Sequence, residues 1–222
     1  MRRLVILRPE PGASATMDRA RKRGLDAVSL PLFRIVPVEW QCPDLARIDA
    51  LLVTSANAVR HAGADLPRLT RLPAYAVGAA TATALLQAGF GVAASGRGGV
   101  DALLREVEPT IRLLHLCGEE RHEPALDSHA VTSVVVYRAV AVEGAIPPGA
   151  LSGAVALVHS PRAGQRLAEL VRERATTSIA AISATAAAAC GRGWGEVAIA
   201  AEPRDEALLS LAERLCNCPV PE

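Results

Sequence analysis

Short apolar runs alternate with amphipathic segments along almost the whole chain. The apolar runs predict β-strands over residues 4–7, 26–30, 50–53, 74–77, 92–94, 113–116, 154–158, 179–182 and 197–200. The segments between them predict helices over 14–22 and 102–107, around 124–129, and onward from Ser55, Thr81, Arg162, Thr185 and Asp205. Strands that alternate with helices of about three turns are typical of parallel sheets covered by helices on both faces. Continuous apolar strands agree with this, because both of their faces are then buried.

Two further segments are expected to be extended without belonging to this alternation. Residues 132–142 form a long apolar segment rich in β-branched side chains, a composition that favours strands. Residues 33–38 also look extended, and Pro37 within them indicates an exposed or edge position, because proline cannot donate to a sheet ladder.

Polar landmarks recur in this apolar frame at a nearly constant offset. Ser160 follows Ser55 by 105 residues, and Thr185 follows Thr81 by 104. Asp101 and Asp205 are also 104 residues apart. Hydrophobic alternation alone would not align three separate polar positions, so the sequence predicts two copies of one α/β unit.

The repeat also covers the two extended segments, since Phe33–Val36 aligns with Tyr137–Val140, again 104 residues apart. We therefore expect an α/β protein of two similar doubly wound parallel-sheet lobes, joined by a two-stranded connector and facing each other across a cleft. Lobe 1 is predicted to combine residues 1–32 with 144–222, and lobe 2 to span 40–133. The connectors are predicted over 33–39 and 134–143.

Hydroxyl side chains occupy the predicted strand-to-helix junctions of both copies. In doubly wound sheets ligands bind at the carboxyl ends of the strands, where free N–H groups at helix starts favour anions. Ser55, Thr81, Ser160 and Thr185 could instead be simple helix N-caps, worth about 1 kcal/mol each. Their recurrence as two matched pairs favours contact with one ligand held from two sides.

Composition and motifs exclude several classes of function. The net charge is +1 with 21% charged residues, which argues against a dedicated nucleic-acid binder with its basic stripe. The chain has no G-x-G-x-x-G or P-loop motif for a nucleotide cofactor, and no run of about 20 apolar residues that would span a membrane. Its five cysteines are scattered without a C-x-x-C pair, which indicates a reducing cytoplasm rather than a zinc ribbon. The histidine spacing fits no metal site.

Five segments, taken in order, resemble the uroporphyrinogen-III synthase family: Val53–Val59, Val77–Ala82, Val136–Arg138, His159–Gly164 and Ile182–Ala186. Their order and spacing match over residues 4–215. The resemblance implies two α/β lobes and cyclisation of the linear tetrapyrrole hydroxymethylbilane, with loss of water and inversion of the last pyrrole ring. It implies no cofactor and no metal.

The resemblance also implies roles for individual residues. Tyr137 matches the family tyrosine that assists departure of the hydroxyl, although its phenol could equally be an ordinary half-covered strand residue. Thr81, Ser160 and Thr185 match positions that line the cleft, and Ser55 and Asn57 complete the hydroxyl and amide set. The substrate carries an acetate and a propionate on every ring, so we expect Arg8 and Arg162 to pair with its carboxylates.

The sequence departs from the family pattern at two places. Ser183-Ala184 stands where Gly-Pro often precedes the second-lobe threonine, and His159 stands where an apolar or aromatic residue is common. The competing hypothesis is a two-lobed module that binds an anionic metabolite without converting it. Most such modules are exported behind a signal peptide, and the apolar run at the start of this chain is too short to be one. We expect a cytoplasmic monomer that binds neither nucleic acid nor membrane.

Overall fold

A computed structural model describes residues 1–96, 98–120 and 129–219. The chain folds into two compact units: unit 1 comprises Met1–Arg34 and Ala141–Glu222, and unit 2 comprises Ile35–Val140. The predicted α/β class with parallel sheets is confirmed. Residues 124–128 of the helix expected around 124–129 lie outside the described residues. None of the helices in the described part is both long and apolar enough to cross a membrane.

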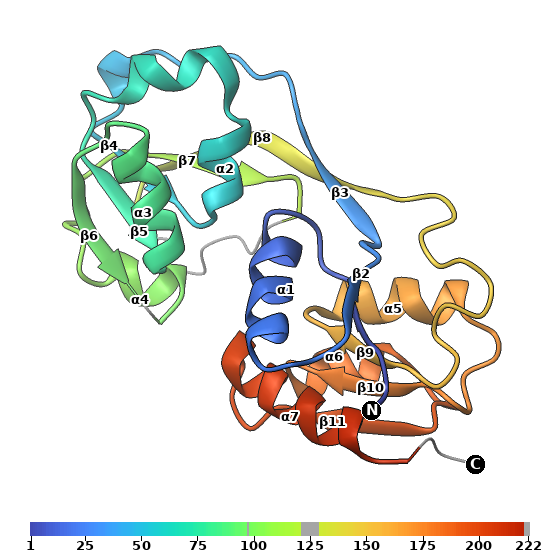
Figure 1. Ribbon diagram of the computed structural model, residues 1–222. Coiled ribbons are helices and arrows are strands. Elements are labelled where there is room, and N and C mark those ends of the chain that lie inside the picture. Colours follow the sequence, from blue (N-terminus) through green and yellow to red (C-terminus); the bar gives the residue numbers. More distant parts are fainter. Residues whose placement is uncertain (97, 121–128, 220–222) are drawn as a thin grey trace. The chain divides into compact units, whose positions relative to one another are not determined.

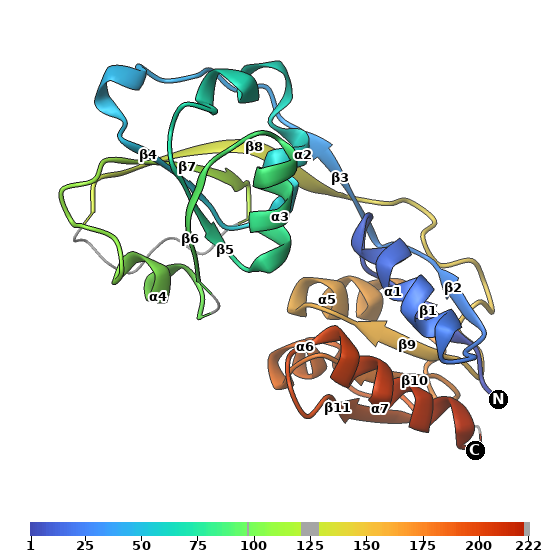
Figure 2. The same ribbon diagram turned by 60° about the vertical axis from the view of Figure 1, so that its left-hand side comes forward.

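Unit 1 is built around a five-stranded parallel sheet with the strand order β11-β10-β9-β1-β2. Its elements are β1 (Leu4–Ile6), α1 (Gly12–Lys22), β2 (Ala27–Ser29), β9 (Val155–Val158), α5 (Pro161–Leu170), β10 (Ser178–Ala181), α6 (Ala184–Ala189), β11 (Glu196–Ile199) and α7 (Asp205–Asn217). The start of the chain therefore completes a sheet built mainly from its last third. Figures 1 and 2 show the blue N-terminal elements lying together with the orange and red C-terminal ones.

Alternation along the strands of unit 1 sends side chains to two separate layers. Leu4 and Ile6 of β1, with Leu157 of β9, pack into one core together with Ala13 of α1 and Leu208 of α7. Helices α5 and α6 contact β9 and β10 as well as each other. Both faces of the sheet are thus covered by helices, which explains why the strands read as unbroken apolar runs.

Unit 2 holds most of a six-stranded sheet with the order β3-β8-β7-β4-β5-β6. Its strands are β3 (Phe33–Pro37), β4 (Ala50–Val53), β5 (Ala74–Val77), β6 (Val92–Gly96), β7 (Leu113–Gly118) and β8 (Val131–Ala141). Its helices are α2 (Ala56–His61), α3 (Ala79–Gln87) and α4 (Val100–Leu104), with 3-10 turns at Leu45–Arg47 and Gly63–Leu69. Strands β3 and β8 each cross the boundary between the units.

Alternation also separates two cores in unit 2. Leu51 and Val53 of β4 share a core with Leu85 of α3. The intervening residue Leu52 packs instead against Leu103 and other residues of α4. The central strand is therefore buried on both sides, as in unit 1.

The strand orders of the two units explain the sequence repeat. The order β11-β10-β9-β1-β2 in unit 1 corresponds strand by strand to β6-β5-β4-β7-β8 in unit 2. Strands β2 and β8 begin at Ala27 and Val131, which preserves the offset of 104 residues. The copy in unit 1 is interrupted, because its β1-α1-β2 segment comes from the opposite end of the chain.

Helices α5 and α6 of unit 1 approach each other most closely at Gly164. A β-carbon at this position would lie 2.8 Å from the Ala186 carbonyl oxygen and 3.0 Å from the Cys190 sulfur. The obstacle includes the backbone of α6, so the contact cannot relax by rotation of one side chain. Glycine is needed here for the close packing of the two helices.

We therefore expect Gly164→Ala to destabilise the protein by about 1–3 kcal/mol, the usual cost of overpacking. A loss of stability would be informative, since replacing glycine by alanine within a helix otherwise stabilises it by up to about 1 kcal/mol. Urea denaturation measures the change, and Gln165→Ala at the exposed next position is the control. A stabilised Gly164→Ala protein would contradict the packing described.

Candidate functional site

Polar residues gather along the carboxyl edge of the parallel sheet in unit 1. Arg8 follows β1, His159 and Ser160 follow β9, and Ser183 follows β10, and these three strands are neighbours in the sheet. The Ser160 hydroxyl accepts a hydrogen bond from the Ala163 amide at 3.2 Å and so caps α5. The edge thus combines a cation with a capped helix start.

Thr185 does not occupy the helix junction at which the sequence placed it. Ser183 is the N-cap of α6 and accepts from the Ala186 amide at 3.2 Å. Thr185 lies two residues later, is exposed, and its hydroxyl oxygen is 2.9 Å from that of Ser183. The two hydroxyls form a pair at the start of α6, of which sequence reasoning singled out only one.

In unit 2, Ser55 and Thr81 also differ in their roles. Ser55 caps α2 and accepts from the Asn57 amide at 3.2 Å, while the half-buried Asn57 side chain accepts from Arg60 at 3.5 Å. Helix α3 is instead capped by Gly78, whose φ of 85° is accessible mainly to glycine. Thr81 is therefore inside the helix and only 4% exposed.

Tyr137 lies in β8, directly opposite Gly118 at the end of β7. Its ring covers Gly118 so closely that a β-carbon there would be 2.7 Å from Cζ and 2.9 Å from the phenol oxygen. The His61 ring is 6.3 Å from the Tyr137 ring, centre to centre. Because position 118 has no side chain, the Tyr137 ring packs directly on the backbone there, and this contact holds the phenol in place within the sheet of unit 2.

Arg162, in the first turn of α5, lies over the ring of Phe33 with 4.2 Å between the guanidinium carbon and the ring centre. This is the geometry of a cation–π contact. Stacking on Phe33 orients the guanidinium.

A partly buried ionic cluster forms around Asp205, the first residue of α7. Its carboxylate accepts hydrogen bonds from His159 Nε2 at 2.8 Å, Arg19 Nε at 2.9 Å, Thr16 Oγ1 at 3.1 Å and Arg8 Nη1 at 3.3 Å. The side chain of Asp205 is 13% exposed. One carboxylate thus ties α1 and α7 to the ends of β1 and β9.

The sequence showed Asp205 only as a landmark of the repeat and His159 only as a departure from the family pattern. No local motif could join them, because His159 and Asp205 are 46 residues apart and Arg19 is 186 residues from Asp205. The cluster could have been suspected only from where its residues fall relative to the predicted strands and helices. All of these residues except Arg19 and Thr16 fall where a predicted strand ends or a predicted helix begins.

The electrostatics of the cluster favour an ionised aspartate and a neutral histidine. Burial by itself raises the pKa of Asp205, but hydrogen bonds from His159 and Arg19 outweigh it and hold that pKa well below its usual range. For His159, burial lowers the pKa, and the positive charge of Arg8 adds to this effect. The hydrogen bond to Asp205 opposes it without reversing it.

His159 is therefore suited to positioning rather than to proton transfer with a substrate. Its Nε2 is engaged by Asp205, and its side chain is only 8% exposed. Nδ1 is buried and makes no hydrogen bond of normal geometry within the described residues, although the Leu157 backbone is close enough to raise the pKa a little. The cluster supplies fixed positive charge at the sheet edge, and neither His159 nor Asp205 offers an accessible acid or base.

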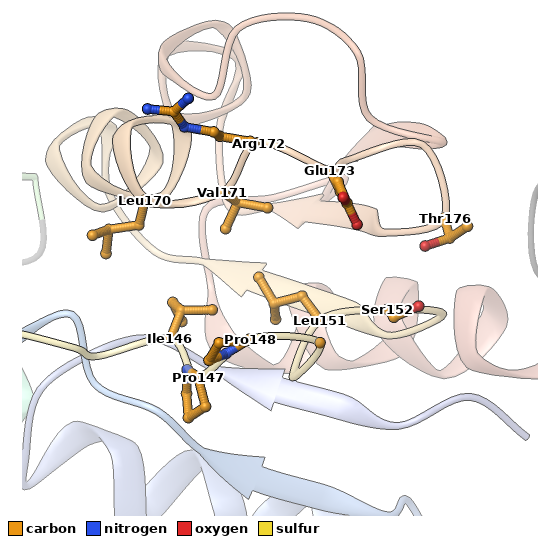
Figure 3. Close-up of a pocket in the computed structure, with 11 residues that line it drawn as sticks. Ile146, Pro147, Pro148, Leu151, Ser152, Leu170, Val171, Arg172, Glu173 and Thr176 are labelled. Atoms are coloured by element: carbon orange, nitrogen blue, oxygen red, sulfur yellow. The ribbon is translucent and has the colours of Figure 1, made fainter.

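A hollow of about 380 Å³ in unit 1 lies away from all of these residues. Figure 3 shows Leu170, Val171 and Arg172 on one side of it and Ile146, Pro147 and Leu151 on the other. These residues precede β9 or lie at the end of α5 and just after it, so the hollow lies toward the opposite edge of the sheet from Ser160. None of the predicted substrate-binding residues lines it.

Comparisons with known proteins agree on one family. The family model described as uroporphyrinogen-III synthase HemD matches residues 14–210. Among solved structures, uroporphyrinogen-III synthetase from Helicobacter pylori is similar, with a TM-score of 0.71, 21% identity, and coverage of 97% of this chain and 100% of that one. A mutant uroporphyrinogen III synthase from the extremely thermophilic bacterium Thermus thermophilus gives a TM-score of 0.52 at 20% identity, covering 96% and 98%. No curated protein sequence gives a significant match.

The lowered pKa of His159 has a consequence for stability. In the unfolded chain His159 takes up a proton below about pH 6.5, whereas the folded protein resists this. The unfolded state then binds more protons, so the stabilisation present above pH 6.5 is progressively lost as the pH falls. Asp205 stays ionised over this range, facing Arg8, Arg19 and His159.

We expect the free energy of unfolding to fall between pH 7 and pH 5, and to fall less in His159→Gln. Urea denaturation at pH 7, 6 and 5 measures both slopes. His129→Gln, which changes another histidine of the chain, serves as the control. Equal slopes for wild type and His159→Gln would show that His159 is not the group responsible.

Proposed function

This chain belongs to the uroporphyrinogen-III synthase family, and we propose how its own residues carry out the family reaction. The enzyme cyclises hydroxymethylbilane with loss of water and inversion of the last pyrrole ring, which gives uroporphyrinogen III and makes it a carbon–oxygen lyase. The observation that carries this conclusion is the family match over residues 14–210. The full-length similarity of the fold to the Helicobacter pylori protein supports it.

The substrate is a linear tetrapyrrole with an acetate and a propionate on every ring, so its recognition is mainly the recognition of carboxylates. We assign Arg8 and Arg162 to ion pairs with these groups, because both guanidinium groups are already held in place, by Asp205 and by Phe33. The remaining contacts are assigned to polar side chains near helix starts in the two units: Ser55, Asn57, Thr81, Ser160 and Thr185. Amide groups at helix starts favour negative charge near these side chains.

Control of orientation accounts for most of the catalysis in this proposal. The substrate closes spontaneously without inversion, so the protein must hold it coiled with the substituted carbon of the last ring placed for attack. Orientation of reacting groups is worth up to roughly 7–11 kcal/mol in model systems. A site of fixed cations and hydroxyls, like the one at the sheet edge of unit 1, suits this task without a strong acid or base.

Tyr137 is assigned to the departure of the hydroxyl. Its phenol transfers a proton to the leaving oxygen as the carbon–oxygen bond breaks, so that the oxygen leaves as water, and the phenolate regains a proton from the one that the substrate loses when the ring closes. Support comes from its fixed position over Gly118. A phenol that cannot swing away donates without first losing conformational freedom.

No observation favours the competing hypothesis of a module that binds an anionic metabolite without converting it. We further propose that the enzyme acts in the cytoplasm, as a monomer. All five cysteines are free thiols, and Cys117, Cys190 and Cys216 are buried, as is common in reducing compartments.

The function is tested by mixing the protein with freshly prepared hydroxymethylbilane and separating the oxidised products by isomer. We expect the type III isomer to predominate and its formation to be proportional to the enzyme concentration. Heat-denatured protein is the control for spontaneous closure. The function would be refuted if only the non-inverted isomer formed, at the spontaneous rate.

For the role of Tyr137, we expect Tyr137→Phe to lower kcat roughly 100-fold, the lower end of the range for general acid assistance. The folded structure should persist, because the ring and its contact with Gly118 remain. Tyr75→Phe makes the same chemical change at the only other tyrosine and should leave kcat unaltered. An unchanged rate in Tyr137→Phe would remove this phenol from the mechanism.

A further inference from the structure

The first residue of α1 is a glycine whose missing side chain leaves space that Arg8 fills. A β-carbon on Gly12 would lie 2.5 Å from Arg8 Nε, 2.7 Å from Cζ and 2.8 Å from Nη2. We propose that Gly12 and Asp205 are positioning residues that together fix the Arg8 guanidinium to bind a carboxylate of the substrate. This inference rests on the proposed function and extends it to two residues that do not themselves contact the substrate.

Gly12 and Asp205 constrain different parts of the same guanidinium. The helix backbone at Gly12 supports the part of the group that carries Nε and Nη2. At the other end, Nη1 donates to Asp205 at 3.3 Å and to Thr16 at 3.4 Å. The guanidinium is thereby fixed both in position and in the rotation of its plane.

Asp205 is itself held, so it can serve as a fixed reference for Arg8. Arg19 and His159 donate to its two oxygens, and its position at the start of α7 favours the negative charge. Two arginines and a neutral histidine around one carboxylate leave the cluster with an excess positive charge. The excess resides where solvent reaches it, on Arg8 and Arg19, whose side chains are 32% and 38% exposed.

The donors that remain on Arg8 suit a carboxylate. Within the described residues, the hydrogen bonds of its side chain all use Nη1, which leaves Nε and Nη2 for a ligand. These two groups point the same way along one edge of a guanidinium and match the two oxygens of a carboxylate. Because the cation is fixed before the ligand arrives, little freedom is lost on binding.

The variant Gly12→Ala should disturb the placement of the Arg8 guanidinium without lowering the stability of the protein. The three atoms nearest to the added methyl group all belong to the far end of the flexible Arg8 side chain, so Arg8 gives way and the helix does not. Alanine also favours helix more than glycine. We expect the Tm to be unchanged or raised, in contrast to Gly164→Ala, while the KM for hydroxymethylbilane rises about tenfold or more, as for loss of a hydrogen bond to a charged group. The kcat should change little, because the lost contact binds substrate and transition state alike.

A double-mutant cycle shows whether Gly12 acts through Arg8. Arg8→Ala alone should raise KM at least as much as Gly12→Ala, and adding Gly12→Ala to Arg8→Ala should then change KM less than about twofold, since residues acting through one contact are not additive. Gly91→Ala, where a β-carbon meets nothing within 4 Å, is the matched control. Asp205→Asn should also raise KM, whereas Asp26→Asn, which alters an exposed pair with Arg3, should not.

The possible outcomes separate the inference from the function on which it rests. If wild type forms the type III isomer and Gly12→Ala leaves KM unchanged, the inference is wrong and the function stands. An equal rise in KM with and without Arg8 would likewise overturn it, as would a loss of Tm as large as that of Gly164→Ala. If wild type fails to form the type III isomer, the proposed function falls and the role of Arg8 falls with it.

Discussion

The carboxylate of Asp205 is the interaction on which the arrangement of unit 1 most depends. It joins two helices and the ends of two neighbouring strands through His159, Arg8, Arg19 and Thr16. A buried carboxylate without partners would be strongly disfavoured, and the hydrogen bonds from His159 and Arg19 keep it ionised. The same contacts orient the cations at the sheet edge, where ligands bind in doubly wound folds. Structural integrity and the chemistry of the site therefore share one group.

Glycine in a helix or strand has three distinct effects in this protein. At Gly164 it allows two helix backbones to approach, and at Gly118 it makes room for the Tyr137 ring. At Gly12 the space is taken by the guanidinium of Arg8. The obstacle to a larger residue is a helix backbone in the first case and a side chain in the other two. The first glycine consequently supports stability, while the others support the placement of particular side chains.

Much of this fold could be predicted from the sequence, because the buried strands are continuous apolar runs and the repeat preserves its offset. The site was less predictable. Ser55 and Ser160 were placed at helix starts correctly, but Gly78 and Ser183 take the capping positions near Thr81 and Thr185. In both cases a glycine or serine just before the threonine can also be the N-cap residue, and the local sequence does not show which of the two is used. The Asp205 cluster depends on pairings across 186 residues, which no local pattern encodes.

The interrupted course of unit 1 has a consequence for how the chain reaches this structure during synthesis. Translation produces β1, α1 and β2 first, yet β1 pairs on one side with β9, which begins only at Val155. Unit 2 can be complete by Val140, so it can fold on the ribosome while the N-terminal segment still waits for its neighbours. During that interval an apolar strand has one edge unpaired, a state prone to aggregation. The segment from β1 to β2 should accordingly be the part of the chain that most needs chaperones during synthesis. A circular permutation that places β1-α1-β2 after α7 would shorten the time for which this segment is exposed.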